Sequence, residues 1–289
     1  MRIRPPIAAL ALVVLAACGG GDGTSSAPSA PLASALDTKV DVGGYSLALS
    51  CRGDGSPTIV LEAGYDSSGL DTWFDLMDPL GAISRVCTYD RAGTGVSDPR
   101  PKGTITSMSE ADELHRLLAA ASIPGPYVVV GHSYGGFISR LFAARYADET
   151  AGLILIDSSH EDEVAPYHRY YGNDPEGNWV DGGDPIDIGA TVHALRATAR
   201  DDGDLPLVVI QAGKYEDVLS VRLWNRTQAD LATLSTDAVH IQATGGHFVM
   251  NDDPQVIIAA VRAVVDAART GERLPACPEL VAGTDASCP

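Results

Sequence analysis

A run of strand-forming residues that ends in a glycine-rich turn constrains this chain more than any other stretch. Residues 128–130 are all valine, which is typical of a strand buried on both faces. The chain continues with Gly131-His132-Ser133-Tyr134-Gly135, which fits the pattern Gly-x-Ser-x-Gly, and then with a segment of helical spacing. A strand, a sharp turn and a helix in this order predict a nucleophile elbow that presents the Ser133 hydroxyl. The glycines allow the strained backbone and the close approach that such a turn needs.

The first residues have the pattern of an export signal. Arg2 and Arg4 precede an apolar run, residues 7–15, that is too short to span a bilayer. Leu15-Ala16-Ala17-Cys18 resembles a bacterial lipobox, which implies that residues 1–17 are a lipoprotein signal peptide and that Cys18 is lipidated. A plain secretory signal is the alternative, but it leaves Cys18 without a role. We expect a protein that is lipid-anchored in the bacterial cell envelope, on the periplasmic side or at the outer membrane, or secreted.

Composition divides the rest of the chain into three parts. Residues 18–36 are rich in Gly, Ser, Ala and Pro and predict a flexible tether. Residues 37–275 are long enough for one α/β domain, and residues 276–289 form a C-terminal tail. The net charge of −18 argues against nucleic acids and anionic lipid headgroups as partners. No later segment is long and apolar enough to span a bilayer, so we expect membrane contact only through the anchor; the oligomeric state stays open.

Four cysteines besides Cys18 predict disulfides. They are Cys51, Cys87, Cys277 and Cys288. An even number in an exported protein indicates two disulfides, for which three pairings exist. Cys277 and Cys288 flank a short segment with Pro and Gly and can close it as a loop, which favours the pairs 51–87 and 277–288. A metal site is disfavoured because no Cys or His has the spacing of metal ligands.

Buried apolar runs alternate with segments of helical periodicity along the body. Besides the central strand, strands are predicted within residues 39–42, 45–50, 59–65, 85–90, 152–157, 205–210 and 238–241. Helices are predicted within residues 70–83, 111–121 and 256–268, and Ser107-Met108-Ser109-Glu110 fits a capping box before the second of them. This alternation predicts an α/β fold whose mostly parallel central sheet is covered by helices on both faces.

Four stretches resemble, in the same order, the motifs of the α/β-hydrolase fold family. They are Leu61-Glu62-Ala63-Gly64-Tyr65, residues 89–97, the elbow, and Gly245-Gly246-His247-Phe248. The resemblance covers about residues 39–269. It implies the α/β-hydrolase fold, places the strand that ends near Cys51 beside the strand of Cys87, and implies ester hydrolysis without a metal or cofactor. The family also contains peptidases, lactonases, acyl transferases and some proteins that are not enzymes, so the fold alone does not give the function.

The resemblance and the chemistry of the residues together indicate a catalytic triad. A serine hydroxyl needs a base to take its proton, and His247, in a glycine-rich loop after the last strand, is the expected base for Ser133. The expected acid is Asp157, at the carboxyl end of its strand, and Asp217 is the alternative. Asp157 could instead only cap the next turn. Haloalkane dehalogenases and epoxide hydrolases are disfavoured, because those relatives have Asp where this chain has Ser133.

Two backbone amides are expected to form the oxyanion hole. Tyr134 supplies one from the elbow, and Tyr65 supplies the other from the loop after an early strand. Many relatives have His-Gly in this loop where the chain has Ala63-Gly64, which leaves the support of the loop open. Asp90 and Arg91 are expected to pair and to hold the neighbouring loop.

Residues 160–204 are expected to form a short lid. This segment carries four aromatic residues, which either suit an apolar acyl or aromatic substrate or only pack the lid onto the body: Tyr167, Tyr170, Tyr171 and Trp179. The sequence therefore predicts a serine hydrolase that cleaves small carboxylic esters through an acyl-enzyme. Three alternatives stay open, namely a lactonase, a non-catalytic surface binding protein, and an exopeptidase that binds a substrate amine through Glu161, Asp162 and Glu163.

Overall fold

The computed structural model describes residues 36–164, 166, 179–198, 203–215 and 218–289. Leu32–Pro289 forms one compact unit, and the account below concerns this unit alone. The predicted signal peptide, the lipidation site at Cys18 and all of the predicted tether except Leu36 lie outside the described residues.

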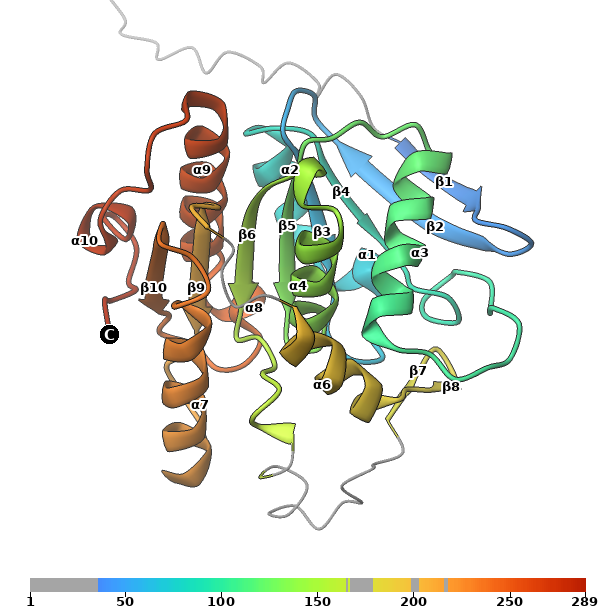
Figure 1. Cartoon of the computed structure of the whole chain (residues 1–289). Helices are drawn as coiled ribbons and strands as arrows, with labels where there is room; N and C mark the ends of the chain where they lie inside the picture. The colour runs from blue at the N-terminus through green and yellow to red at the C-terminus, as the bar shows by residue number, and fades with distance from the viewer. Residues whose placement is uncertain (1–35, 165, 167–178, 199–202, 216–217) are drawn as a thin grey trace, which may run out of the picture. The chain divides into compact units, whose positions relative to one another are not determined.

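A mostly parallel sheet forms the centre of this unit (Figure 1). Within the described residues its strand order is β1-β2-β4-β3-β5-β6-β9-β10. The strands are β1 (Leu36–Asp41), β2 (Ser46–Arg52), β3 (Thr58–Glu62), β4 (Val86–Tyr89), β5 (Tyr127–His132), β6 (Thr150–Ile156), β9 (Leu207–Gln211) and β10 (Ala238–Gln242). β2 runs antiparallel to β1 and to β4, and every other pair in the sheet is parallel. The predicted fold class is therefore confirmed.

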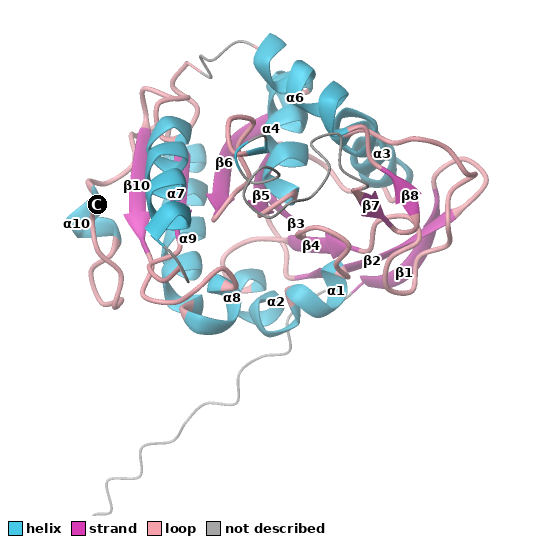
Figure 2. Ribbon diagram, turned by 90° about the horizontal axis from the view of Figure 1, so that it is seen from below, coloured by secondary structure: helices cyan, strands magenta, loops and turns pink. Residues whose placement is uncertain are grey.

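Helices cover both faces of the sheet (Figure 2). One face carries α3 (Ser107–Ala120), α4 (Gly135–Arg145) and α6 (Ile188–Ala197), and the other carries α2 (Phe74–Gly81) and α9 (Pro254–Thr270). Among the described residues, the remaining helices with given bounds are α1 (Gly69–Thr72), the 3-10 turn η1 (Ala147–Glu149), α7 (Val218–Leu231), α8 (Val249–Asp252) and α10 (Cys277–Leu280).

The all-apolar sequence of β5 follows from this double cover. Val129 packs into the cluster under α3 and α4, whereas Val128 and Val130 pack into the cluster under α2 and α9. All three side chains have no exposed surface. A strand whose alternate residues point to two buried faces must be apolar at every position, and this strand carries the elbow.

The helix α3 begins one residue away from the predicted capping box. Thr106, in extended conformation, is its N-cap: the Thr106 hydroxyl accepts from the Ser109 amide, and the Ser109 hydroxyl accepts from the Thr106 amide. Ser107 is instead buried, and its hydroxyl donates to the hydroxyl of Tyr134. Glu110, expected to complete the box, accepts from the same Tyr134 hydroxyl at 2.6 Å. The predicted start at Ser107 is therefore wrong by one residue, because Ser107 and Glu110 both bond Tyr134 of the elbow instead of capping the helix.

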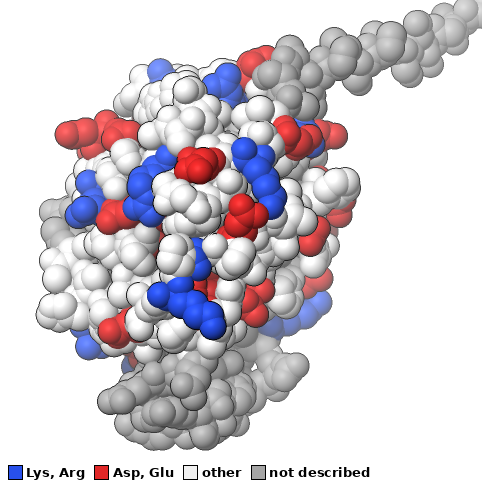
Figure 3. All heavy atoms as spheres, turned by 90° about the vertical axis from the view of Figure 1, so that its right-hand side faces the viewer, with Lys and Arg blue, Asp and Glu red and all other residues white. Residues whose placement is uncertain are grey.

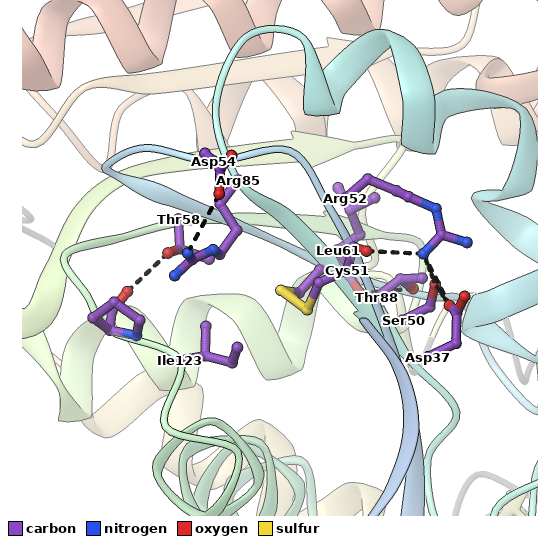
Figure 4. The surroundings of a disulfide bond; sticks show 12 residues. Asp37, Ser50, Cys51, Arg52, Asp54, Thr58, Leu61, Arg85, Thr88 and Ile123 are labelled. Atoms are coloured by element: carbon purple, nitrogen blue, oxygen red, sulfur yellow. Dashed lines mark hydrogen bonds and ion pairs between the residues drawn. A yellow bond between two sulfur atoms is a disulfide. The ribbon is translucent and has the colours of Figure 1, made fainter. Parts of the chain in front are cut away.

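Two disulfides join the pairs that the sequence favoured. Cys51 of β2 and Cys87 of β4 are register partners and are bonded, and Cys277 is bonded to Cys288. Figure 4 shows the first bond between the two strand ribbons, with Arg52 beside it hydrogen-bonded to the side chains of Ser50 and Asp37.

The C-terminal tail closes one edge of the sheet. The two backbone hydrogen bonds between Ser287 and Gln242 place the tail along β10, and the bond from Cys277 to Cys288 closes the tail into a loop. An edge strand with free hydrogen-bonding groups invites pairing with other chains, and the tail covers part of this edge. Within the described residues, no helix has the length and apolarity needed to cross a membrane.

Candidate active site

The elbow has the strained geometry that its sequence predicts. Ser133 lies between β5 and α4 with φ of +53°, in the left-handed region that side-chain-bearing residues rarely adopt. The Ser133 amide donates to the carbonyl of Ile156 at 3.1 Å, and the Ser159 amide donates to the carbonyl of Ser133 at 3.0 Å. These two bonds tie the turn to β6. A Cβ on Gly135 would lie 2.4 Å from the Ala63 carbonyl oxygen, so only glycine fits there.

The three predicted triad residues meet at the carboxyl ends of parallel strands. His247 lies in the loop between β10 and α8, and its Nε2 is 3.0 Å from the Ser133 Oγ. The other ring nitrogen, Nδ1, is 2.6 Å from the Asp157 Oδ2. Asp157 directly follows β6 and has no exposed surface. A hydroxyl, an imidazole and a buried carboxylate in this order form a path along which a proton can leave the hydroxyl.

The second oxygen of Asp157 is held in place by the loop that follows β9. Oδ1 accepts from the Ala212 amide at 2.9 Å and from the Tyr215 hydroxyl at 2.6 Å. Burial, together with the charge of Asp157, raises the pKa of Tyr215, so its hydroxyl remains a donor. Asp217, the alternative acid, lies outside the described residues. The sequence analysis missed Tyr215, which no local pattern connects to a carboxylate 58 residues away.

His132 is packed beneath the site. Its ring is 4.6 Å from the ring of His247, centroid to centroid, and its Nε2 is 2.9 Å from the His247 carbonyl oxygen. Burial is the main cause that lowers the pKa of His132 to about 4, and the nearby His247 adds to it. A neutral imidazole donates from Nε2 to that carbonyl and fixes the backbone of the catalytic loop.

The loop after β3 brings Tyr65 beside Ser133. A Cβ on Gly64 would lie 3.0 Å from the His132 Nδ1 and 3.5 Å from the Ser133 Cβ, so the loop passes directly over the elbow. Tyr134 precedes α4, and its amide lies at the start of that helix. Within the described part of the chain, neither the Tyr65 nor the Tyr134 amide N–H donates a hydrogen bond. Both donors are therefore available to a ligand oxygen.

Asp90 and Arg91 do not form the pair that the sequence predicted. Asp90 accepts from the Ser68 hydroxyl, the Leu70 amide and the Val96 amide, and so holds its own loop against α1. Arg91 donates to carboxylates and carbonyls of other segments. Adjacent side chains on an extended segment point to opposite sides, which is why the two residues face different partners.

The acidic residues after Asp157 are buried or paired. Glu161 forms a bidentate pair with Arg140, and Asp162 pairs with Arg196 at 2.9 Å. Burial raises the pKa of Glu163 to about 8, so this carboxyl is protonated at neutral pH.

Part of the predicted lid contacts the loop after β3 that carries Tyr65. A two-stranded hairpin, β7 (Val180–Asp181) and β8 (Asp184–Pro185), lies in this segment, and α6 follows it. The ring of Trp179 is edge-on to that of Tyr65, with centroids 5.2 Å apart. The other three aromatic residues expected in the lid lie outside the described residues: Tyr167, Tyr170 and Tyr171.

Comparison with known proteins agrees with this architecture. The family model described as alpha/beta hydrolase fold matches residues 57–177. A solved serine hydrolase involved in carbazole degradation, the CarC enzyme, superposes with a TM-score of 0.58 at 16% identity, covering 81% of this chain and 99% of its own. The haloalkane dehalogenase DatA from Agrobacterium tumefaciens C58 superposes equally well, with a TM-score of 0.58 at 16% identity over 82% and 98% of the two chains. The chain has the α/β-hydrolase fold.

Sequence similarity extends over most of the α/β-hydrolase fold. The uncharacterized protein YqjL of Bacillus subtilis (strain 168) is 29% identical over 216 residues, which cover 73% of this chain and 84% of that protein. Because a serine hydrolase and a haloalkane dehalogenase share the fold with this chain, the fold leaves the reaction open, and the side chains of the site must distinguish the possibilities.

Proposed function

We propose that this protein is a serine hydrolase that cleaves carboxylic esters through an acyl-enzyme. The observation that carries the proposal is the continuous contact from the Ser133 Oγ through both ring nitrogens of His247 to the buried Asp157, over distances of 3.0 and 2.6 Å. A haloalkane dehalogenase or epoxide hydrolase reaction is not proposed, because the residue at the elbow is a serine.

The reaction follows from the roles that these side chains can take. Ser133 attacks the ester carbonyl while His247 takes the hydroxyl proton, and Asp157 stabilises the imidazolium and its orientation. The carbonyl oxygen gains negative charge, which the Tyr65 and Tyr134 amides can hold. His247 then gives the proton to the leaving alcohol. Water, activated by the same histidine, attacks the acyl-enzyme and releases the acid.

The rim of the site favours an apolar substrate. The side chains of Phe248 and Tyr65 are 56% and 40% exposed, and the Phe248 ring is 5.4 Å from that of His247. Exposed aromatic surface next to the reacting atoms can be covered by an apolar acyl or alcohol group, which supports a substrate without charge near the ester.

The contacts of the lid acids weaken the exopeptidase alternative. Glu161 and Asp162 bind arginine side chains, and Glu163 is buried, which raises its pKa to about 8 and favours its neutral form. None of the three therefore presents an unpaired carboxylate to a substrate amine. A lactonase would use the same triad on a cyclic ester, so the proposal includes lactones as a subset of esters.

The proposal also includes export and a lipid anchor at Cys18. Two disulfides in a chain of this size are typical of an oxidising compartment, which supports export. The lipobox resemblance supports the anchor. Metabolic labelling of growing bacteria with a radioactive fatty acid tests it, since Cys18→Ser should abolish the label, and retention of label in that variant would contradict the proposal.

The proposed activity is tested with a series of p-nitrophenyl esters from short to long acyl chains. The Ser133→Ala variant should lose a factor on the order of 10⁶ in kcat, as expected when the nucleophile of a triad is removed. The matched control is Ser158→Ala, which removes a neighbouring buried hydroxyl that donates to the Ser159 carbonyl. This control should keep activity within about tenfold. A folded parent protein that hydrolyses no ester or lactone in the series would contradict the proposal.

A further inference from the structure

Arg91 is a buried cation that joins three segments of the chain at the edge of the proposed active site. Its side chain is 1% exposed. It donates to Glu62 at the end of β3 at 2.6 Å, to the carbonyls of Ala63 and Gly64 at 2.9 and 2.6 Å, and to both carboxylate oxygens of Asp181 at 2.7 and 2.8 Å. The planar guanidinium has five N–H donors in a fixed fork, and these bonds use that geometry fully.

The bond to the Gly64 carbonyl fixes the direction of the Tyr65 N–H. The carbonyl of Gly64 and the amide of Tyr65 belong to one peptide group, which is planar, so in its trans form the N–H points opposite to the C=O. A guanidinium that holds the Gly64 oxygen at 2.6 Å therefore aims the Tyr65 N–H away from Arg91. Tyr65 is the proposed oxyanion donor of this loop. Arg91 thus supplies the support that the Ala63-Gly64 sequence left open.

Asp181 comes from the hairpin of the predicted lid and completes this support. Besides its two bonds to Arg91, it accepts from the Asp66 amide at 2.9 Å, on the far side of Tyr65. The Asp66 carboxylate in turn accepts from the Gly182 amide, and the Tyr65 hydroxyl accepts from the Val180 amide at 2.9 Å. The hairpin therefore hydrogen-bonds to residues 63–66, here called the oxyanion loop, both directly and through Arg91. These bonds lie on both sides of the Tyr65 amide.

The backbone of the hairpin also contacts the backbone of the Arg91 loop, at two glycines that no larger residue can replace. A Cβ on Gly93 would lie 2.1 Å from the Gly182 carbonyl oxygen, and a Cβ on Gly182 would lie 1.9 Å from the Ala92 carbonyl oxygen. Both glycines have positive φ. The loop that carries Arg91 and the hairpin that carries Asp181 thus touch through their backbones, which brings the two charged side chains within bonding distance in a site without water access.

We propose that Asp181, acting through Arg91, is the positioning residue of the oxyanion hole, so that the lid hairpin is part of the machinery that stabilises the transition state. The inference rests on the proposed hydrolase function, because an oxyanion hole matters only where a carbonyl is attacked. Neither residue touches the substrate. Their effect reaches the reaction through the orientation of one peptide group, and this orientation stabilises the oxyanion rather than the bound ester.

The test compares Asp181→Asn with Asp184→Asn. Both residues are buried in the same hairpin, but Asp184 faces Arg100 at 3.9 Å and, among the described residues, has no hydrogen bond or ion pair to the loop of residues 63–66. Asp181→Asn keeps the shape and removes one of the two carboxylate charges bonded to Arg91, the other being that of Glu62. We expect kcat on the best p-nitrophenyl ester to fall by about 10- to 100-fold with KM changed less than about twofold, since removal of a whole oxyanion donor costs about 10²–10³. Asp184→Asn should keep kcat within about threefold.

A second readout does not depend on the identity of the ester. Phosphonylation of Ser133 by a fluorophosphonate also builds negative charge on an oxygen in the oxyanion hole, so its rate constant should fall in Asp181→Asn in parallel with kcat. The pH profile of kcat should keep its shape, because the triad is untouched. Damage to His247 or Asp157 would move that profile, and a purely structural effect would change KM and thermal stability without the selective loss of kcat.

A third variant keeps the inference testable if Asp181→Asn does not fold. Asp66 is exposed and has φ of +47°, which glycine adopts without strain, so Asp66→Gly removes only the carboxylate that binds Gly182. We expect a kcat reduced several-fold at unchanged KM. Equal kcat and labelling rates in wild type and Asp66→Gly would overturn the inference where Asp181→Asn does not fold, and where it folds the same equality in Asp181→Asn would overturn it. Absence of ester turnover with rapid labelling of wild type would contradict only the ester proposal, and the labelling rates would still decide the positioning role.

Discussion

At the scale of single residues, the short side chain of Asp157 determines how this carboxylate reaches His247. Asp157 directly follows β6 and reaches His247 with a short side chain while its other oxygen is held by Ala212 and Tyr215. The φ of Asp157 is +40°, so the backbone itself is strained to place this carboxylate. Strain at both Ser133 and Asp157 indicates that the surroundings hold these two residues in one arrangement.

Asp157→Asn is expected to lower kcat by about 10⁴ with little change in KM, as found when the acid of a triad becomes an amide. The amide cannot stabilise the imidazolium, and it can hold His247 in the wrong tautomer. Steady-state kinetics on the best ester measure the loss. Asp237→Asn is the control, because Asp237 is a buried carboxylate that accepts from the Leu274 amide far from the triad. A loss below tenfold in Asp157→Asn would point to Asp217 as the acid.

His132 is expected to make the protein less stable in acid. Its pKa is lowered to about 4 in the folded protein, from 6.5 in an unfolded chain. Between these values the unfolded chain binds more protons, so the free energy of unfolding falls as pH drops through this window. The total is about 3 kcal/mol at about 1.4 kcal/mol per pKa unit. His132→Gln should reduce the loss measured by urea unfolding between pH 7 and pH 4 by roughly that amount.

The half-buried His115 on α3 provides the control for this measurement. His115→Gln removes a ring that contacts Glu149 at 3.0 Å, away from the site, and it measures how far a His→Gln change by itself alters the pH dependence of unfolding. A His132→Gln variant with the same pH slope as wild type would show that folding does not lower the pKa of His132, and it would contradict the acid sensitivity assigned to this residue.

At the scale of elements, sequence predicted what periodicity and local chemistry encode. β5 has apolar residues on both faces and the elbow pattern at its end, and α9 has buried residues at helical spacing from Val256 to Val265. α6 and α7 were missed: α6 lies in a poorly patterned insert, and residues such as Arg222 and Gln228 mask the periodicity of α7. Contacts between residues far apart in the sequence were also missed. Arg91 and Asp181 form such an ion pair and are 90 residues apart.

The two disulfides should contribute unequally to stability. A cross-link lowers the entropy of the unfolded chain more when it closes a longer loop, and the sequence separations are 36 residues for Cys51–Cys87 and 11 for Cys277–Cys288. The expected losses are about 4 kcal/mol for Cys51→Ala/Cys87→Ala and about 3 kcal/mol for Cys277→Ala/Cys288→Ala. Urea unfolding of both double variants under the same oxidising conditions measures them. A larger loss for the tail pair would contradict the loop-entropy argument.

At the scale of the whole molecule, the described acidic residues differ in their surroundings. Some are buried with cations, as Glu62 and Asp181 are with Arg91. Others lie on the surface, where the face in Figure 3 shows Asp and Glu interspersed with Lys and Arg. With 38 acidic and 20 basic residues, the protein carries a surplus of negative charge. The surplus carboxylates repel one another across the surface.

This surplus predicts that moderate salt stabilises the protein. The Debye length falls from about 30 Å at 0.01 M to about 8 Å at 0.15 M, which screens repulsion between surface carboxylates while buried pairs such as Arg91–Asp181 are screened far less. A gain on the order of 1 kcal/mol corresponds to a rise in Tm of roughly 2–4 °C for a body of this size.

Sodium chloride is the salt to use in differential scanning calorimetry, because sulfate and phosphate strengthen apolar burial by another route. The same titration at pH 4.5, near the isoelectric point, is the control and should give a much smaller rise, because the net charge is close to zero there. A Tm that falls with salt at pH 7 would mean that attractive surface pairs outweigh the net repulsion.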